Sequence, residues 1–169
     1  SQGVCFLPHL RIANPPFGDA PSRGAFIGLT GDVNRGTLCR AVLEGIAFEA
    51  KLCLDGLLSY AGIAGVNRIV AIGGSTRNDL LMSIKASIYG EPITIPETEE
   101  ATALGAAILG GLGANVYQNI DDVRSSIIQS VRLVEPEREL MKAYEESFST
   151  YKYVYPSLKD LNARIDNEN

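Results

Sequence analysis

A short apolar run that enters a pair of glycines and then a helix constrains this chain more than any other feature. Residues 68–72 are rich in β-branched side chains and are followed at once by Gly73 and Gly74. Such a run predicts a strand that ends in a tight turn. Apolar residues then recur at three- and four-residue spacing as far as Ile88, which predicts a helix that starts near Asn78. A strand, a glycine turn and a helix in this order indicate a layered α/β domain.

Helical and extended patterns alternate on both sides of this unit. The expected helices cover residues 37–60, 99–112, 121–128 and 137–155, and the expected strands cover 25–29 and 93–95. Gly90 should end the helix that starts near Asn78, and the glycines between 110 and 113 should end the alanine-rich one. We therefore expect a central mixed sheet flanked by helices, with residues 69–72 as a buried strand.

Two apolar stripes at helical spacing predict where the core lies. The first is on the helix at 37–60 and should face the sheet; its members include Leu38, Val42, Ile46 and Cys53. The second is aromatic and should pack against the domain body; it consists of Tyr144, Phe148, Tyr151 and Tyr155.

The length of 169 residues favours one compact domain. We assign residues 1–160 to it and expect the polar segment 161–169 to be a disordered tail. The sequence contains no apolar run long enough to span a membrane and no secretory signal pattern, so we expect a cytoplasmic protein without a membrane partner. Three cysteines without CxxC spacing, Cys5, Cys39 and Cys53, predict buried free thiols.

The charge distribution argues against a nucleic-acid partner. Fifteen basic and twenty acidic residues give a net charge of −5, and the basic residues are scattered along the chain. An acidic protein can still hold a phosphate group, because backbone N–H groups at a helix start bind anions without a basic surface.

The Gly73–Gly74 turn is the candidate binding site. Two residues without Cβ atoms let a flat ligand lie directly against the backbone. The side chains of Ser75, Thr76 and Asn78 can hydrogen-bond a purine or a ribose, or they can cap the helix, with Asn78 as an ordinary N-cap in a tight turn. The turn alone leaves both interpretations open.

Four segments together resemble the C-terminal domain of FGGY-family carbohydrate kinases of the xylulokinase-like type. They are residues 23–30, 38–48, 73–74 and 100–107, in the order and spacing of that family. The positions that match the second FGGY signature are Gly24, Phe26, Gly28, Leu29, Leu38, Ala41, Val42, Leu43 and Glu44. The resemblance extends over nearly the whole chain.

The resemblance implies an actin-like ATPase domain with a ribonuclease H-like α/β fold, and a function in which the γ-phosphate of ATP passes to a hydroxyl of a ketose, polyol or related sugar. In such kinases the adenosine lies against the glycine turn, a role that we carry onto Gly73, Gly74, Ser75 and Asn78. The catalytic base, the phosphate loops and most contacts to Mg²⁺ and the sugar belong to an N-terminal domain that this sequence lacks. No catalytic residue or metal ligand is therefore assigned, and the chain alone should be a poor catalyst. We also expect an exposed apolar interface and self-association into a homo-oligomer.

One departure from the family keeps a second function open. Residues 7–15 resemble the stretch LPYLxGERxP but lack its Gly-Glu-Arg, so a non-catalytic nucleotide-binding or scaffolding module is the alternative. Three isolated features are assigned structural and not catalytic or ligand-binding roles. His9 is expected to be a loop residue, the acids at 99–100 to be charges at a helix start, and Arg23 to be half of a structural ion pair.

Overall fold

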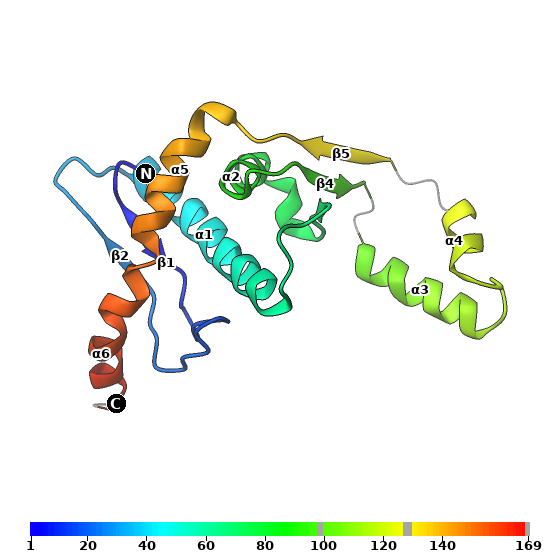
Figure 1. The fold of residues 1–169 in the computed structure, drawn as a ribbon, viewed down its shortest axis with the longest axis horizontal. Coiled ribbons are helices and arrows are strands. Elements are labelled where there is room, and N and C mark those ends of the chain that lie inside the picture. Colours follow the sequence, from blue (N-terminus) through cyan, green and yellow to red (C-terminus); the bar gives the residue numbers. More distant parts are fainter. Residues whose placement is uncertain (98–99, 127–129, 168–169) are drawn as a thin grey trace.

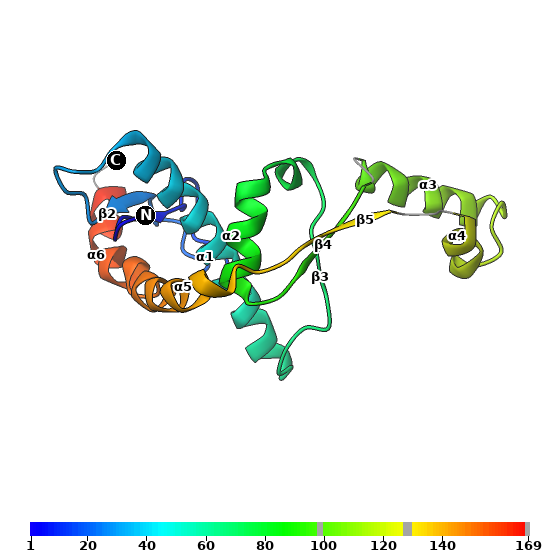
Figure 2. The ribbon, with the colours of Figure 1, turned by 90° about the horizontal axis from the view of Figure 1, so that it is seen from above.

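The structure, a computed structural model, describes residues 1–97, 100–126 and 130–167. Figure 1 shows mixed helices and strands in the order β1 (Cys5–Leu7), β2 (Ala25–Ile27), α1 (Arg35–Ala61), β3 (Ile69–Val70), η1 (Gly74–Arg77), α2 (Asp79–Tyr89), β4 (Ile93–Pro96), α3 (Ala101–Gly113), α4 (Ile120–Ser126), β5 (Val131–Val134), α5 (Arg138–Tyr151) and α6 (Val154–Asn167). Figure 2 shows α1, α5, α6 and the strands β1 and β2 at one end, β3–β5 in the middle, and α3 and α4 at the other end.

The strands form two small sheets. β1 and β2 pair antiparallel, with Cys5 opposite Ile27. In the second sheet β4 lies between a parallel β3 and an antiparallel β5, with the order β3-β4-β5. The fold is therefore α/β with a mixed sheet, as predicted, although the predicted strands do not all join one sheet. Neither β1 nor β5 was predicted, because three or four extended residues leave almost no periodic signal.

Helix α1 is the longest element and is capped at both ends. The Asn34 side chain accepts a hydrogen bond from the Thr37 backbone N–H, and Gly62 ends the helix with a left-handed φ of 65°. Its buried face agrees with the predicted one only in part: Leu38 and Val42 are partly buried against a core cluster, whereas Ile46 is 37% exposed and Ala41, Ala47 and Phe48 are buried. The helix approaches β1 closely at Gly45, where an added Cβ atom would collide with the Phe6 carbonyl.

The aromatic stripe is confirmed as core. Phe48 on α1 lies among three aromatic rings of α5, with centroids 5.3 Å from Tyr151, 5.7 Å from Phe148 and 6.2 Å from Tyr144. Tyr155 on α6 belongs to the same buried cluster. A second cluster joins α2 to β4, and its buried members are Leu81, Met82, Ala86, Ile93 and Ile95.

A buried polar chain crosses this core. His9 contacts Ser22 Oγ through Nδ1 at 2.7 Å and Glu49 through Nε2 at 3.1 Å. The Tyr151 hydroxyl donates to the other Glu49 oxygen at 2.9 Å. Burial, and next the adjacent Glu49 carboxylate, raise the pKa of Tyr151, so its hydroxyl keeps the proton that it donates. The hydrogen bonds supply partners to polar groups that would otherwise be costly to bury.

The structure corrects several boundaries at the C-terminal end. The helix expected at 137–155 is broken into α5 and α6. Pro156 explains the break, because a proline ring clashes with the carbonyl four residues earlier but is tolerated in the first turn of α6. Residues 161–167, expected to be disordered, continue α6.

Other corrections concern the middle of the chain. Residues 69–72 are not a buried strand, because β3 is an edge strand in which Val70 is 44% exposed, and Ile72 beyond it is 56% exposed. The glycines at 110 and 111 lie inside α3 and do not end it. Gly90 is confirmed as the cap of α2, with φ 74°. The expected helix ends at residues 99 and 128 fall outside the described residues.

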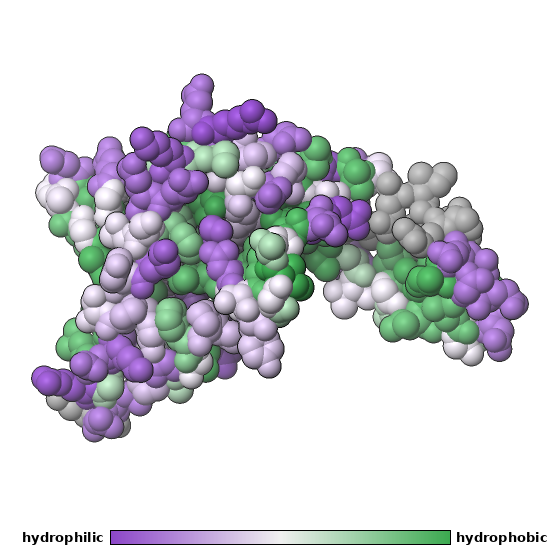
Figure 3. All heavy atoms as spheres, in the orientation of Figure 1, coloured by the Kyte–Doolittle hydropathy of each residue, from purple (hydrophilic) through white to green (hydrophobic). Residues whose placement is uncertain are grey.

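Exposed large apolar side chains are spread along the chain, and α3 carries one of them, Leu109, which is 71% exposed. This helix stands away from the body together with α4, and none of its residues is buried. The space-filling view shows hydrophobic residues on this projection (Figure 3). Among the described residues, no helix is both long and apolar enough to span a bilayer. The three cysteines are free, and Cys39 is exposed, so the prediction of buried thiols is wrong at that position.

Replacement of Gly45 by alanine should destabilise the protein. A Cβ atom at Gly45 would lie 2.1 Å from the Phe6 carbonyl oxygen, so α1 and β1 would have to separate. Overpacking of this kind costs about 1–3 kcal/mol. The matched control is Gly56→Ala in the same helix, where the new Cβ would lie 3.5 Å from Pro16 and the change should stabilise by about 0.5–1 kcal/mol. Urea unfolding measures both, and equal effects would contradict the close packing of α1 on β1.

Loss of the Tyr151 hydroxyl should also destabilise the fold. Tyr151→Phe leaves a buried Glu49 oxygen without its donor, which costs about 1–3 kcal/mol. The control is Tyr153→Phe, since Tyr153 is 73% exposed and its change should be neutral within about 0.5 kcal/mol. Thermal unfolding at neutral pH compares the two variants, and an unaltered Tyr151→Phe protein would show that the hydrogen bond contributes nothing.

Candidate functional site

A concave feature lined by the glycine turn lies where the parallel strands β3 and β4 end. It is a cavity of about 640 Å³. Its walls come from residues 72–74 and 76–77 after β3, 95–97 at the end of β4, 100–102 at the start of α3, and Arg132 on β5. Ligands of open α/β sheets characteristically bind beyond the carboxyl ends of the strands. The topology therefore places this cavity where a binding site is expected.

The turn between β3 and α2 is built by local hydrogen bonds. Gly73 has φ 90° and ψ 175°, a conformation essentially restricted to glycine. Its carbonyl accepts from the Thr76 backbone N–H at 3.0 Å and from the Thr76 hydroxyl at 2.8 Å. Asn78 then caps α2 by accepting from the Leu81 N–H at 3.0 Å. The chain thereby reverses within one short 3₁₀ turn, η1.

Unlike Gly73, Gly74 does not have a backbone conformation that requires glycine. Its φ is not positive, and a Cβ added to it would meet no atom within 4 Å. The folded chain itself therefore has no need of glycine at this position. The open backbone of Gly74 faces the cavity, and a ligand that approaches it would be the first group to sense a side chain there.

The four predicted site residues separate into two pairs. Gly73 and Gly74 line the cavity, whereas Ser75 and Asn78 are exposed and lie outside its lining. The Asn78 side-chain oxygen is engaged by the helix cap, which is the structural role that the sequence left open. Its amide N–H groups are not engaged by that cap.

Several cavity residues are not among the four predicted site residues, although Thr76 was considered as a possible ligand contact. Thr76 and Arg77 belong to the turn itself, and Glu97, Glu100 and Thr102 follow β4. The family resemblance included residues 100–107, so position 100 carried a signal that was not extended to the site. Arg132 comes from a strand that the sequence analysis missed, and its position could be found only from the pairing of β5 with β4.

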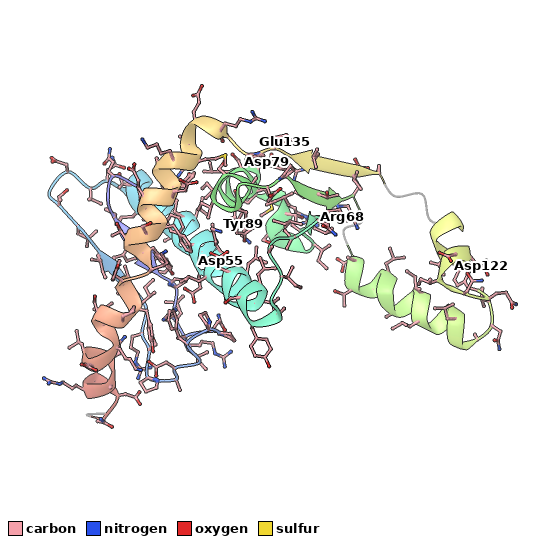
Figure 4. All side chains as sticks on the ribbon, in the orientation of Figure 1. Asp55, Arg68, Asp79, Tyr89, Asp122 and Glu135 are labelled. Atoms are coloured by element: carbon pink, nitrogen blue, oxygen red, sulfur yellow. The ribbon has the colours of Figure 1, made fainter. Side chains whose placement is uncertain are left out.

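Arg132 connects the third strand to the turn. Its Nη2 donates to the Thr76 carbonyl at 2.8 Å, and its Nη1 contacts the Asp79 carboxylate at 2.6 Å. Figure 4 labels Asp79 at the start of α2, close to β5. One guanidinium group thus bridges the end of η1 and the first residue of α2.

The acids of the cavity do not by themselves make a metal site. Among residues 1–97, 100–126 and 130–167, no group of three or more His, Cys, Asp or Glu side chains could hold an ion. The described residues therefore do not provide a complete Mg²⁺ site.

Two other residues considered for the site, His9 and Arg23, are engaged by structural partners. Both ring nitrogens of the buried His9 contact Ser22 and Glu49, which leaves neither to act as a base on a bound substrate. Arg23 forms an ion pair with Asp166 at 2.5 Å, which confirms its structural role. Of the two adjacent acids at the start of α3, residue 99 lies outside the described residues, and Glu100 occupies the N-cap position without a side-chain cap hydrogen bond.

The two glycines should respond differently to alanine in the ligand-free protein. Gly73→Ala forces a side chain into the glycine-only region and should lower the free energy of unfolding by about 1–3 kcal/mol. Gly74→Ala meets open space at an ordinary φ and should change it by less than about 0.5 kcal/mol. Urea unfolding without ligand tests both, and a strongly destabilised Gly74→Ala protein would contradict the separation of roles.

Known proteins share this architecture over almost the entire chain. A xyloylose kinase structure from Brucella ovis superposes with a TM-score of 0.82 at 35% identity, over 94% of this chain and 33% of its own. The glycerol kinase of Plasmodium falciparum, solved with ADP, gives 0.74 at 28% identity, over 88% of this chain and 30% of its own. These matches confirm the actin-like α/β fold.

Sequence comparison gives the same assignment. The xylulose kinase of Bacillus subtilis (strain 168) is 30% identical over 165 residues, which are 98% of this chain and 33% of that protein. The chain thus spans about a third of the length of curated relatives that it matches. The family profile described as "FGGY family of carbohydrate kinases, C-terminal domain" matches residues 1–114. The chain therefore belongs to the FGGY family of carbohydrate kinases.

Proposed function

We propose that this chain supplies the nucleotide-binding part of an ATP-dependent carbohydrate kinase. In the full-length protein the γ-phosphate of ATP is transferred to a hydroxyl of a ketose, polyol or related sugar. The observation that carries the proposal is the bare backbone of Gly74 beside a cavity of about 640 Å³ at the carboxyl ends of β3 and β4. The folded chain does not itself require a glycine at position 74, so we assign the need for a residue without a side chain to ligand binding.

The adenosine of ATP suits this position. A purine is flat and can lie in van der Waals contact with a backbone that has no Cβ atoms. Gly73 and Gly74 provide such a surface, and the Asn78 amide group, which the helix cap leaves with N–H donors, is available to a ring nitrogen or ribose hydroxyl. The ADP in the Plasmodium falciparum glycerol kinase structure supports a nucleotide as the ligand.

The contribution of this chain to the reaction is positioning. Phosphoryl transfer depends mainly on holding donor and acceptor in line and on stabilising charge. The turn at 73–78 would fix the adenosine end of ATP and so the direction in which its phosphates leave the cavity. This chain spans about a third of the length of its relatives. The base and the contacts to Mg²⁺ and sugar are assigned to the part of the kinase outside it.

A non-catalytic nucleotide-binding module remains the alternative, favoured by the absence of Gly-Glu-Arg from the stretch at 7–15. The structure gives this stretch a packing role, since His9 and Ala13 are fully buried. The full-length protein distinguishes the two functions: a kinase binds ATP and consumes it with a sugar or polyol, whereas the module binds ATP without turnover.

Gly74→Val should weaken ATP binding in the full-length protein by more than tenfold, roughly 1.4 kcal/mol. The branched side chain would occupy the space assigned to the purine, while sugar affinity should stay unchanged. Calorimetric titration with ATP and with the sugar measures the two affinities separately.

The control for this change is Gly65→Val, at a glycine outside the cavity whose added Cβ also meets open space. Circular dichroism verifies that both variants are folded. ATP affinity that stays the same in folded Gly74→Val protein would place the adenosine elsewhere.

A further inference from the structure

The turn that carries the proposed nucleotide site is weakly held by packing. None of the four residues of η1 is buried. Two glycines precede or begin it, and glycine loses more backbone freedom on ordering than any other residue. A binding surface made of such a segment needs an external contact if it is to keep one shape before the ligand arrives.

Arg132 provides a contact of this kind. Its guanidinium group donates to the Thr76 carbonyl at 2.8 Å and reaches the Asp79 carboxylate at 2.6 Å. The group is planar and its donors are fixed relative to one another. Contact with both partners therefore restrains the last part of η1 relative to the first residue of α2, across the helix cap at Asn78.

The exposure of this ion pair argues against a role in overall stability. The Arg132 side chain is 41% exposed and that of Asp79 is 84% exposed. Ion pairs so open to solvent contribute little to the free energy of unfolding. Their effect is confined to local geometry, and here the local geometry is that of the cavity, because Arg132 and Thr76 both line it.

We propose that Arg132 is a positioning residue for nucleotide binding, which holds the turn at 74–77 in its binding shape through Thr76 and Asp79. The inference rests on the proposed function, since it assumes that a nucleotide occupies this cavity. Without Arg132, the cost of ordering the turn would be met at the moment of binding and would appear as weaker ATP affinity.

The experiment uses the full-length protein with four variants. Arg132→Met keeps most of the apolar stem and removes every hydrogen bond, and Asp79→Ala removes the carboxylate partner. The double variant tests whether the two act together, and Asp79→Asn keeps an acceptor oxygen at the same place. The control is Arg138→Met, six residues further along and outside the cavity lining.

We expect Arg132→Met to raise the Kd for ATP about tenfold and to leave the Kd for sugar unchanged. The KM for ATP should rise by the same factor, with kcat at saturating ATP within twofold of the wild type. Asp79→Ala should weaken ATP binding in the same direction, the double variant should be no weaker than Arg132→Met, and Asp79→Asn should restore most of the affinity. Hydrogen exchange of the amides at 74–78 should be faster in ligand-free Arg132→Met than in Arg138→Met.

Several results would overturn the inference. Unchanged ATP affinity in Arg132→Met shows that the turn needs no such support. If Arg132→Met weakens ATP binding, Asp79→Ala does not weaken it in the same way, and the losses add in the double variant, Arg132 contacts the ligand directly. If Arg132→Met does not fold, Asp79→Ala with its Asp79→Asn rescue decides the question on the exposed partner. Wild-type protein that binds no ATP rejects the proposed function itself, a result distinct from the others.

Discussion

The close approach of α1 to β1 is the contact on which the rest of the structure depends. It requires Gly45, because a side chain there would collide with the Phe6 carbonyl. At this distance Phe48 reaches the aromatic rings of α5, and Glu49 reaches both His9 and Tyr151. One glycine on a long helix thus allows the apolar core and the buried polar chain to form side by side.

The candidate site is connected to this core through α2. Its inward side chains Ile84 and Ile88 belong to the aromatic core, and Leu81 and Met82 belong to the cluster under β4. The start of α2 is therefore fixed, and so is the residue from which the glycine turn departs. On the β4 side the cavity is lined by Ile95, which is buried in the cluster under β4, while no residue of η1 is buried.

Three residues of the site have different physical tasks. Gly73 is needed for a backbone conformation that other residues rarely adopt. Gly74 leaves the backbone bare towards the cavity, and Arg132 ties the turn to β5. Sequence alone treats the two glycines as one motif, and only their separate backbone angles show that the fold needs glycine at position 73 and not at position 74.

The sequence by itself determined the elements whose signals are local. Apolar periodicity and a glycine cap marked α2, and the long apolar pattern marked α1. The signature between residues 24 and 44 marked the family. The tertiary structure decided which face of α1 is buried, since the close approach to β1 needs a residue without a side chain at Gly45. It also decided that β5 pairs with β4 and brings Arg132 to the turn. Pairing between segments more than thirty residues apart depends on contacts across space, which no short window of sequence contains.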